Sequence, residues 1–232
     1  MRYWLVMPAA GAGRRFGERI PKQYAPLHGR TVIEWALAPF LSDPRCAGAV
    51  VALAPDDTRW PKVAEHISPV TIAPGGAERS VSVRHALAGL SRRAEKNDWV
   101  LVHDAARPCL SRVDLDRLVN EAGSHPVGGL LAMPTADTLK RARSDRSVGE
   151  TVDRTEFWRA ATPQMFRYGR LCEALDRAIA GKRAPTDEAQ ALEWLGEHPL
   201  LVECSASNIK ITSADDLIVA AALLGAREGK TQ

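Results

Sequence analysis

The chain has 232 residues, which is enough for one substantial domain or barely for two small ones. Apolar residues make up 45% and charged residues 25%, the ordinary proportions of a soluble globular protein. The formal net charge of +3 is small, so the composition gives no indication of a nucleic-acid-coating surface, and it is compatible with a local basic site for an anionic substrate.

The first apolar run, residues 3–7, predicts a short buried strand that leads into a glycine-containing loop. Gly11 and Gly13 remove Cβ atoms where a backbone must approach a ligand closely. Successive N–H groups in such a turn can form a nest for phosphate oxygens. Because Arg15 and Lys22 add positive charge to the same loop, we favour a triphosphate site over a plain surface turn.

Two familiar glycine motifs do not fit this loop. The dinucleotide fingerprint needs a third glycine at the position of Phe16, and Gly17 comes one residue late. The P-loop motif is absent from the chain, because no Gly-Lys-Ser or Gly-Lys-Thr occurs in it. The spacing therefore excludes a dehydrogenase of the usual kind.

Apolar strand-like runs alternate with amphipathic helical runs in the next part of the chain. A capping box at Thr31 and Glu34 predicts the start of a helix. Further strands are expected at 49–53, 70–73, 99–102 and 128–133, with one helix that ends at 64–67 and another at 83–90. This alternation predicts an α/β fold whose mostly parallel sheet is flanked by helices.

Three loops follow predicted strands, at 8–22, 75–82 and 103–108. Ligands of open α/β sheets sit at the carboxyl ends of the strands, so we expect these loops to share one site. Ser82 and the backbone near it can reach a base or ribose, although an ordinary loop with a helix cap is an equally good interpretation.

The loop after the strand at 99–102 carries candidate groups for a metal and an anion. Asp104 is placed to hold Mg²⁺, which takes one or two carboxylates together with substrate phosphates. Arg107 can engage a second anion through its planar guanidinium, and a structural Asp–Arg pair is the alternative. His103 fits a hydrogen-bonded structural residue better than a general base.

The second half of the chain begins with a change of pattern at 134–154. Its charged centre predicts a projecting hairpin, with an irregular surface loop as an equal alternative. Lys210 is expected in a short apolar strand at 208–212, where a charge needs an anion. The remaining elements are helices near 168–179 and 186–195, a strand at 200–203 and a closing helix at 213–224.

No activated nucleophile stands out. The chain has no Gly-x-Ser-x-Gly elbow, and its four cysteines lie far apart without zinc-site spacing, which indicates reduced thiols in a cytoplasmic protein. No segment approaches the length needed to cross a bilayer. A phosphomonoester is largely dianionic at neutral pH, so a phosphate nucleophile needs Arg, Lys and Mg²⁺ rather than a base.

Six motifs stand in order along the chain. They are Pro8-Ala9-Ala10-Gly11-Ala12-Gly13-Arg14-Arg15, Pro21-Lys22-Gln23-Tyr24, His103-Asp104-Ala105-Ala106-Arg107-Pro108, Thr162-Pro163-Gln164, Thr186-Asp187-Glu188 and Asn208-Ile209-Lys210-Ile211-Thr212. Together they resemble the 2-C-methyl-D-erythritol 4-phosphate cytidylyltransferases of non-mevalonate isoprenoid biosynthesis. The resemblance implies a Rossmann-like nucleotidyltransferase fold, with one domain over residues 1–232 and a projecting dimerisation arm at 134–154.

The resemblance also implies an activity and its residues. CTP and the polyol phosphate would give the CDP-alcohol and pyrophosphate, with Mg²⁺ or another divalent cation. The implied catalytic residues are Arg15, Lys22, Asp104 and Lys210. Asp104 is also the implied metal ligand. The implied substrate-binding residues are Ala9, Ala10, Gly11, Ala12, Gly13, Gly76, Ser82, Arg107, Thr138, Arg154 and Thr186.

These residues would divide between the substrates and between two subunits. Gly76 and Ser82 would lie near the cytosine, and Arg107 and Thr186 would meet the methylerythritol phosphate. The resemblance implies a homodimer with crossing arms, so Thr138 and Arg154 would reach the partner subunit's substrate.

Three other functions stay open at this point. A sister cytidylyltransferase that acts on ribitol 5-phosphate shares the fold, but those enzymes carry Gly-Gly where this chain has Ala9-Ala10. A sugar-1-phosphate nucleotidylyltransferase that uses another base is a wider alternative. A non-enzymatic nucleotide-sensing domain is disfavoured, since binding alone would not need all four implied catalytic residues.

Overall fold

The computed structural model of the chain describes residues 1–11 and 20–228. Its centre is a seven-stranded sheet with the order β11-β7-β10-β6-β1-β4-β5. The strands are β1 (Tyr3–Pro8), β4 (Cys46–Leu53), β5 (Thr71–Pro74), β6 (Trp99–Val102), β7 (Gly128–Pro134), β10 (Trp158–Arg167) and β11 (Leu200–Glu203). All neighbours in the sheet pair in parallel except β10, which is antiparallel to β6 and β7. The predicted mostly parallel sheet is confirmed.

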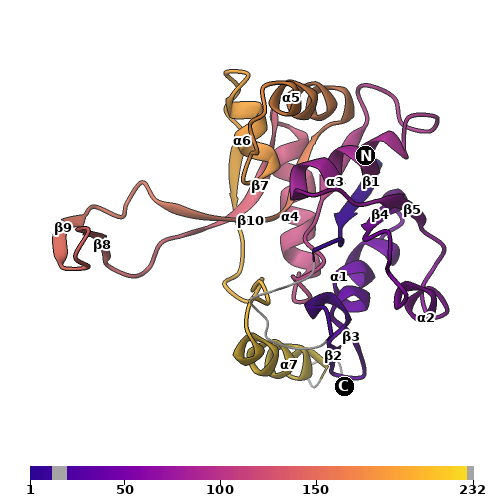
Figure 1. Cartoon of the computed structure of the whole chain (residues 1–232), viewed down its shortest axis with the longest axis horizontal. Helices are drawn as coiled ribbons and strands as arrows, with labels where there is room; N and C mark the ends of the chain where they lie inside the picture. Colours follow the sequence, from indigo (N-terminus) through magenta and orange to yellow (C-terminus); the bar gives the residue numbers. More distant parts are fainter. Residues whose placement is uncertain (12–19, 229–232) are drawn as a thin grey trace.

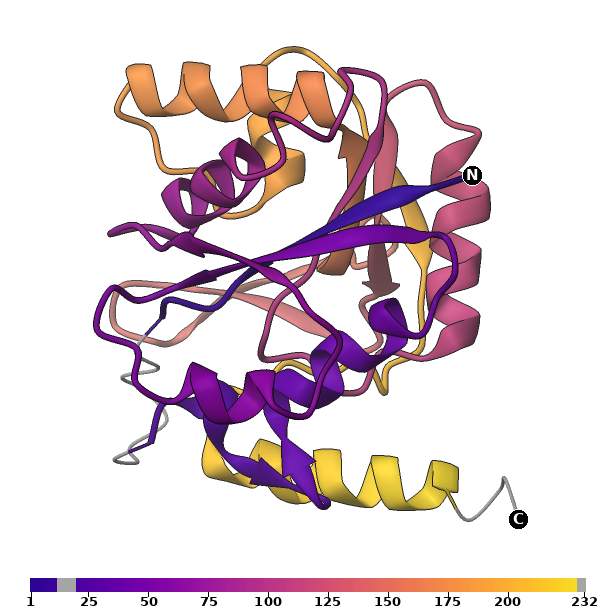
Figure 2. The same cartoon turned by 90° about the vertical axis from the view of Figure 1, so that its right-hand side faces the viewer.

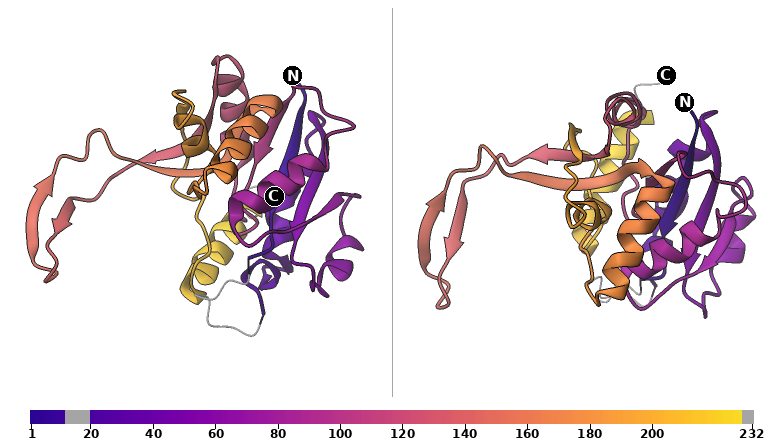
Figure 3. Two further views of the ribbon diagram at one scale, coloured as in Figure 1. Left: turned by 45° about the horizontal axis from the view of Figure 1, so that its top comes forward. Right: turned by 90° about the horizontal axis from the view of Figure 1, so that it is seen from above.

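Helices cover both faces of this sheet (Figures 2 and 3). The helices, together with the two strands of a small hairpin, are α1 (Val32–Leu41), α2 (Trp60–Ala64), α3 (Arg79–Ala88), α4 (Arg112–Gly123), α5 (Tyr168–Ala180), α6 (Glu188–Glu193), α7 (Ala214–Glu228), β2 (Pro26–Leu27) and β3 (Arg30–Thr31). Side chains alternate along β1, so Leu5 and Met7 enter the core under α1, α2 and α4, and Val6 enters the core under α3, α5 and α6. A third cluster lies between α7 and the small β2–β3 hairpin.

Helix α1 shows how local sequence produces these elements. The predicted capping box is confirmed, because the Thr31 backbone N–H donates to Glu34 Oε2 at 2.6 Å. Ile33, Leu37 and Phe40 follow at helical spacing and are fully buried. Burial of these side chains holds α1 against the sheet. The segment before α1, which carries Lys22 and Gln23, thereby lies at the carboxyl edge of the sheet.

Several sequence-based boundaries are wrong. The helix expected to end at 64–67 ends at Ala64, and residues 208–212 form no strand, because no strand among residues 1–11 and 20–228 pairs with them. That segment is held by single contacts instead, among them the Ile211 N–H to the Ala106 carbonyl at 2.8 Å. Helix α4 and strand β10 were not predicted.

Residues 134–154 contain an antiparallel hairpin of β8 (Leu139–Ala142) and β9 (Val148–Val152). It extends far from the sheet, and almost all its side chains are exposed (Figure 1). Its role as a dimerisation arm, and the assignment of 1–232 to one domain, stay predictions. Among the helices of the described residues, none is long and apolar enough to span a membrane.

Candidate active site

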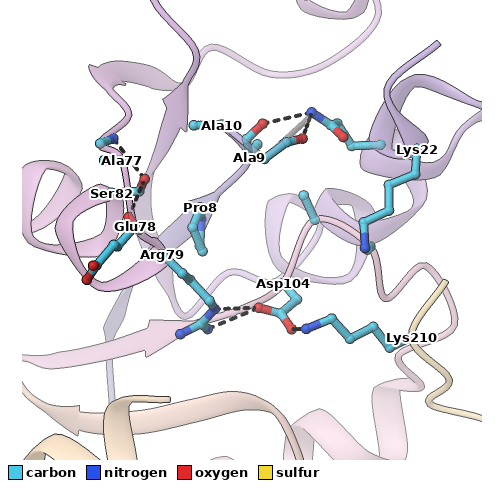
Figure 4. Close-up of a pocket in the computed structure, with 15 residues that line it drawn as sticks. Pro8, Ala9, Ala10, Lys22, Ala77, Glu78, Arg79, Ser82, Asp104 and Lys210 are labelled. Atoms are coloured by element: carbon cyan, nitrogen blue, oxygen red, sulfur yellow. Dashed lines mark hydrogen bonds and ion pairs between the residues drawn. The ribbon is translucent and has the colours of Figure 1, made fainter. Parts of the chain in front are cut away.

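A cavity of about 580 Å³ opens at the carboxyl ends of β1, β5 and β6 (Figure 4). The three loops expected to converge all contribute to it, together with the segment that carries Lys210. Its lining residues are Pro8, Ala9, Ala10, Gly11, Lys22, Gln23, Gly76, Ala77, Glu78, Arg79, Ser82, Asp104, Ala105, Ala106 and Lys210.

The loop after β1 is held in place by its own backbone and by Gln23. The Ala9 N–H donates to the Ala52 carbonyl at 2.8 Å, and Gln23 Nε2 donates to the Ala9 carbonyl at 2.8 Å. A Cβ built on Gly11 would meet no atom of the described residues within 4 Å, so this backbone faces open space. Three predicted site residues, Ala12, Gly13 and Arg15, lie outside the described residues.

The loop before α3 is closed by Ser82. Its Oγ accepts from the Gly76 N–H at 2.9 Å and donates to the Glu78 carbonyl at 3.1 Å. A Cβ on Gly76 would lie 2.3 Å from Val81 Cγ1, so this turn requires glycine. Ser82 therefore shapes the cavity wall, and its contact with a substrate stays a prediction.

Asp104 lies between two cations on the cavity floor (Figure 4). Its Oδ1 accepts from Arg79 Nε at 3.0 Å, and its Oδ2 lies 2.7 Å from Lys210 Nζ. Burial raises the pKa of the Asp104 carboxyl, but the charges of Arg79 and then Lys210 outweigh it and hold that pKa well below its usual value. The carboxylate is therefore ionised at working pH, and Lys210 has the anion that its charge required.

Arg107 lies behind the cavity wall, with 8% of its surface exposed. Its Nη1 donates to the Asn208 carbonyl at 2.7 Å, while its Nε lies 3.9 Å from Asp104 Oδ2. Within the described part of the chain, that buried Nε has no hydrogen-bond partner. Arg107 thus braces the segment that carries Lys210, and its contact with an anionic substrate stays a prediction.

A buried polar network fixes the backbone of Asp104. His103 is fully buried, and its Nε2 lies 3.1 Å from the Arg107 carbonyl, which can only accept, so Nε2 carries the proton. The Thr162 hydroxyl lies 3.0 Å from His103 Nδ1 and accepts the Asp104 N–H at 3.0 Å. Both ring nitrogens are engaged within the protein, which fits the structural role expected for His103.

This burial gives a pH test of the network. Burial is the largest influence on the His103 pKa and lowers it from 6.5 to about 4. Between these pH values His103 is protonated in the unfolded chain and neutral in the folded protein. The free energy of unfolding therefore falls as the pH falls from about 6.5 to about 4. We expect His103→Gln to flatten this decline in denaturant titrations, and the exposed control His198→Gln to keep it. Equal slopes in both variants would contradict the assignment.

Two further hydrogen bonds hold the segment that carries Lys210. Asn208 Nδ2 donates to the Thr162 carbonyl at 2.9 Å, and Lys22 Nζ donates to the Ile211 carbonyl at 3.0 Å. Both candidate catalytic lysines are therefore positioned through one segment, and Lys210 keeps 40% of its side chain exposed.

Four predicted substrate-binding residues do not line the cavity of the described chain: Arg107, Thr138, Arg154 and Thr186. Thr138 and Arg154 are exposed at the base of the arm, where Arg154 donates to the Ala136 carbonyl. Thr186 is exposed just before α6. The predicted residues brought together at the cavity are Ala9, Ala10, Gly11, Lys22, Gly76, Ser82, Asp104 and Lys210.

Sequence reasoning missed Arg79 and Glu188. Arg79 is the first residue of α3, a position where a cation opposes the helix dipole. That unfavourable placement was a usable signal, because such a residue needs nearby acids. Arg79 binds two of them, Asp104 and Glu188.

The cavity suits a divalent cation that arrives with a triphosphate. Asp104 is ionised and lines the cavity, and Mg²⁺ commonly binds through one carboxylate plus substrate phosphates. The described residues contain no group of three or more His, Cys, Asp or Glu side chains that could hold a metal by themselves. The donor set therefore fits Mg²⁺ shared with a nucleotide.

Comparison with known proteins identifies close relatives. The 2-C-methyl-D-erythritol 4-phosphate cytidylyltransferase family pattern matches residues 3–226. The enzyme of that name from Ectopseudomonas mendocina is 53% identical to this chain, over 93% of this chain and 93% of its own length. The Halorhodospira halophila enzyme is also 53% identical, over 100% of this chain and 97% of its own length. A solved 4-diphosphocytidyl-2C-methyl-D-erythritol synthase superposes with a TM-score of 0.84 at 40% identity, over 96% of this chain and 98% of the other. The Francisella tularensis 2-C-methyl-D-erythritol 4-phosphate cytidylyltransferase superposes with a TM-score of 0.80 at 35% identity, over 96% of this chain and 100% of the other.

Proposed function

Since this chain belongs to the 2-C-methyl-D-erythritol 4-phosphate cytidylyltransferase family, we propose that its cavity transfers the cytidylyl group of CTP to 2-C-methyl-D-erythritol 4-phosphate. The products are 4-diphosphocytidyl-2-C-methyl-D-erythritol and pyrophosphate. The observation that supports this assignment most is the meeting of Lys22, Asp104 and Lys210 beside the loop after β1. Cations and backbone N–H groups there match what a triphosphate needs.

The transfer needs little covalent chemistry from the protein. A phosphate oxygen of the polyol phosphate attacks the α-phosphorus of CTP, and the bond to the bridging oxygen breaks to release pyrophosphate. The attacking phosphate has its second pKa near 6, so no enzymic base has to remove a proton. The protein's task is to align the two phosphates and to neutralise charge as the α-phosphorus becomes five-coordinate.

The cavity residues divide this task by position. The backbone from Ala9 to Gly11 would face the triphosphate, and Lys22 would stabilise the α-phosphate together with Arg15. Lys210 would hold the attacking phosphate near the same atom. Asp104 would hold Mg²⁺, which when bound offsets phosphate charge. Gly76 and Ser82 would border the cytosine.

The arm would complete the second substrate site. We propose a homodimer in which Thr138 and Arg154 reach the partner subunit's polyol phosphate, beside Arg107 and Thr186. The support is that the arm projects from the sheet (Figure 1) and that Thr138 and Arg154 are exposed and do not line the cavity of their own chain. A cytoplasmic location is supported by the four cysteines, which are all free thiols.

Replacing Arg154 with alanine should mainly raise KM for the polyol phosphate, by roughly tenfold, because one charge-assisted hydrogen bond to phosphate is lost. We expect kcat and the CTP KM to change little in steady-state assays. Arg143→Ala, on the exposed tip of the same arm, is the matched control. An unchanged KM in Arg154→Ala would contradict the assignment.

Mixed dimers decide whose cavity the arm serves. A dimer of one Arg154→Ala subunit and one Lys22→Ala subunit keeps one normal site if arms act on the partner, because the intact cavity receives the intact arm. If each arm served its own cavity, both sites of the mixed dimer would be defective. Normal polyol-phosphate KM in the mixed dimer supports the first arrangement.

Pyrophosphate release by the purified protein tests the function itself. The assay contains CTP and Mg²⁺ and compares 2-C-methyl-D-erythritol 4-phosphate with ribitol 5-phosphate. We expect release only with the former. Release only with the latter would move the protein to the sister cytidylyltransferases, and release with neither would favour a nucleotide-binding domain.

A further inference from the structure

We infer that Arg79, clamped by the buried Glu188, is a positioning residue that sets Asp104 and Lys210 in the cavity. The inference rests on the proposed function, since it concerns that same site. It adds two residues, from α3 and α6, to the groups implied by the resemblance.

The guanidinium of Arg79 is occupied on two sides. At its end, Nη1 lies 2.6 Å from Glu188 Oε1, and Nη2 lies 3.0 Å from Glu188 Oε2. At its side, Nε and Nη2 both lie 3.0 Å from Asp104 Oδ1. A fork that already holds two carboxylates has little left for a phosphate. Arg79 therefore acts through Asp104 rather than on the substrate.

The contacts join four residues of alternating charge, Glu188, Arg79, Asp104 and Lys210, from the protein interior to the cavity (Figure 4 shows the last three). Glu188 is 1% exposed, Asp104 is 7% exposed, and Lys210 meets solvent at the open end. The two middle members, Arg79 and Asp104, each contact an opposite charge on both sides. Removing the charge of one member therefore leaves a buried neighbour with an unbalanced charge. The position of Lys210 thus depends on Glu188, although Glu188 does not line the cavity.

Glu188 is itself rigidly held. It opens α6, whose N-cap residue Asp187 accepts from Gln164 Nε2 at 2.9 Å, while the Ala189 N–H donates to Gln164 Oε1 at 2.9 Å. Gln164 belongs to β10 in the middle of the sheet. Through Glu188, the cavity cation Arg79 is fixed to the sheet and to the turn that carries Thr186.

Stability alone does not explain this arrangement. An arginine at the first position of α3 works against the helix dipole, and Glu188 has to be buried as a charge. Both features are unfavourable for folding taken singly. They become useful if the ion pairs hold Asp104 and Lys210 in the geometry that the reaction needs.

The variant Glu188→Gln tests this inference, because glutamine keeps the size of the side chain and removes its charge. We expect kcat to fall about tenfold, as for other residues that orient a ligand from behind, with the CTP KM within about twofold. Arg79→Lys should lose a similar factor, since an ammonium cannot bridge two carboxylates with a fork. The double variant should be no slower than the slower single variant, because both act through one unit. Glu193→Gln, exposed at the other end of α6, is the matched control.

Thermal unfolding of every variant, with kcat measured well below its transition, separates positioning from folding. A folded Glu188→Gln or Arg79→Lys that keeps kcat within twofold of wild type would overturn the inference. So would losses that disappear once the folded fraction is accounted for, or losses that multiply in the double variant. The wild-type rate in the same assay keeps the two hypotheses apart. An inactive wild type would reject the proposed function, whereas an active wild type with equally active variants would reject only the role of Arg79 and Glu188.

Discussion

Replacing Lys22 with alanine should lower kcat by roughly 10²- to 10³-fold, the usual loss when one donor to a developing charge is removed. Lys22 begins the short turn Lys22–Tyr24, lines the cavity, and its Nζ lies 3.0 Å from the Ile211 carbonyl. The extra negative charge on the α-phosphate exists only in the transition state, so affinity for CTP should fall much less.

Single-turnover rates and equilibrium CTP binding measure these two effects separately. Lys62→Ala, which removes an exposed lysine from α2, should leave both unchanged. A Lys22→Ala enzyme that turns over within threefold of wild type would show that this lysine is not catalytic. Arg15 lies outside the described residues, and for Arg15→Ala we also expect a large fall in kcat with a much smaller fall in CTP affinity.

Asp104→Asn should have the second large effect, a loss of on the order of 10²- to 10³-fold in kcat/KM. Asparagine matches the shape of aspartate, but it leaves Arg79 and Lys210 without the shared anion that now lies 3.0 Å and 2.7 Å from them. The same change removes the carboxylate proposed to hold Mg²⁺, so saturation with the cation should need higher concentrations.

The measurement is kcat/KM as a function of Mg²⁺ concentration, together with the unfolding midpoint. Asp56→Asn, an exposed aspartate on the loop after β4, provides the control. If Asp104→Asn shows the wild-type rate at the wild-type Mg²⁺ concentration, the carboxylate has neither role.

Local signals predicted much of the fold. The strand expected at 99–102 is β6 with the same bounds, and the capping box at Thr31 starts α1 as expected. Helix α4 could have been predicted too, since Ser111 caps it and its apolar residues are spaced for one buried face. Strand β10 was harder, because Pro163 lies inside it and proline argues against a central strand. The structure accommodates this with a shift of register against β7 between Ala160 and Gln164.

The sequence predicted the part of the candidate site that is formed by loops at the carboxyl edge of the sheet. Lys210 was identified because a charge among apolar residues needs an anion, and Asp104 is that anion, although the surrounding strand was a wrong prediction. The contact between Arg79 and Glu188 joins residues 109 positions apart. No local pattern specifies such a pair, because its partners meet only after the sheet has brought α3 and α6 together.

The contact from Lys22 to Ile211 also bears on when the enzyme matures during synthesis. It joins positions 189 residues apart, and from the same late segment Lys210 reaches back to Asp104. A nascent chain can form β1, β4 and β6 early, yet its cavity lacks a wall until the segment at 208–211 has left the ribosome. Activity should therefore begin only after residues 208–211 have been synthesised, and fragments that end before residue 208, which lack Lys210, should not consume CTP.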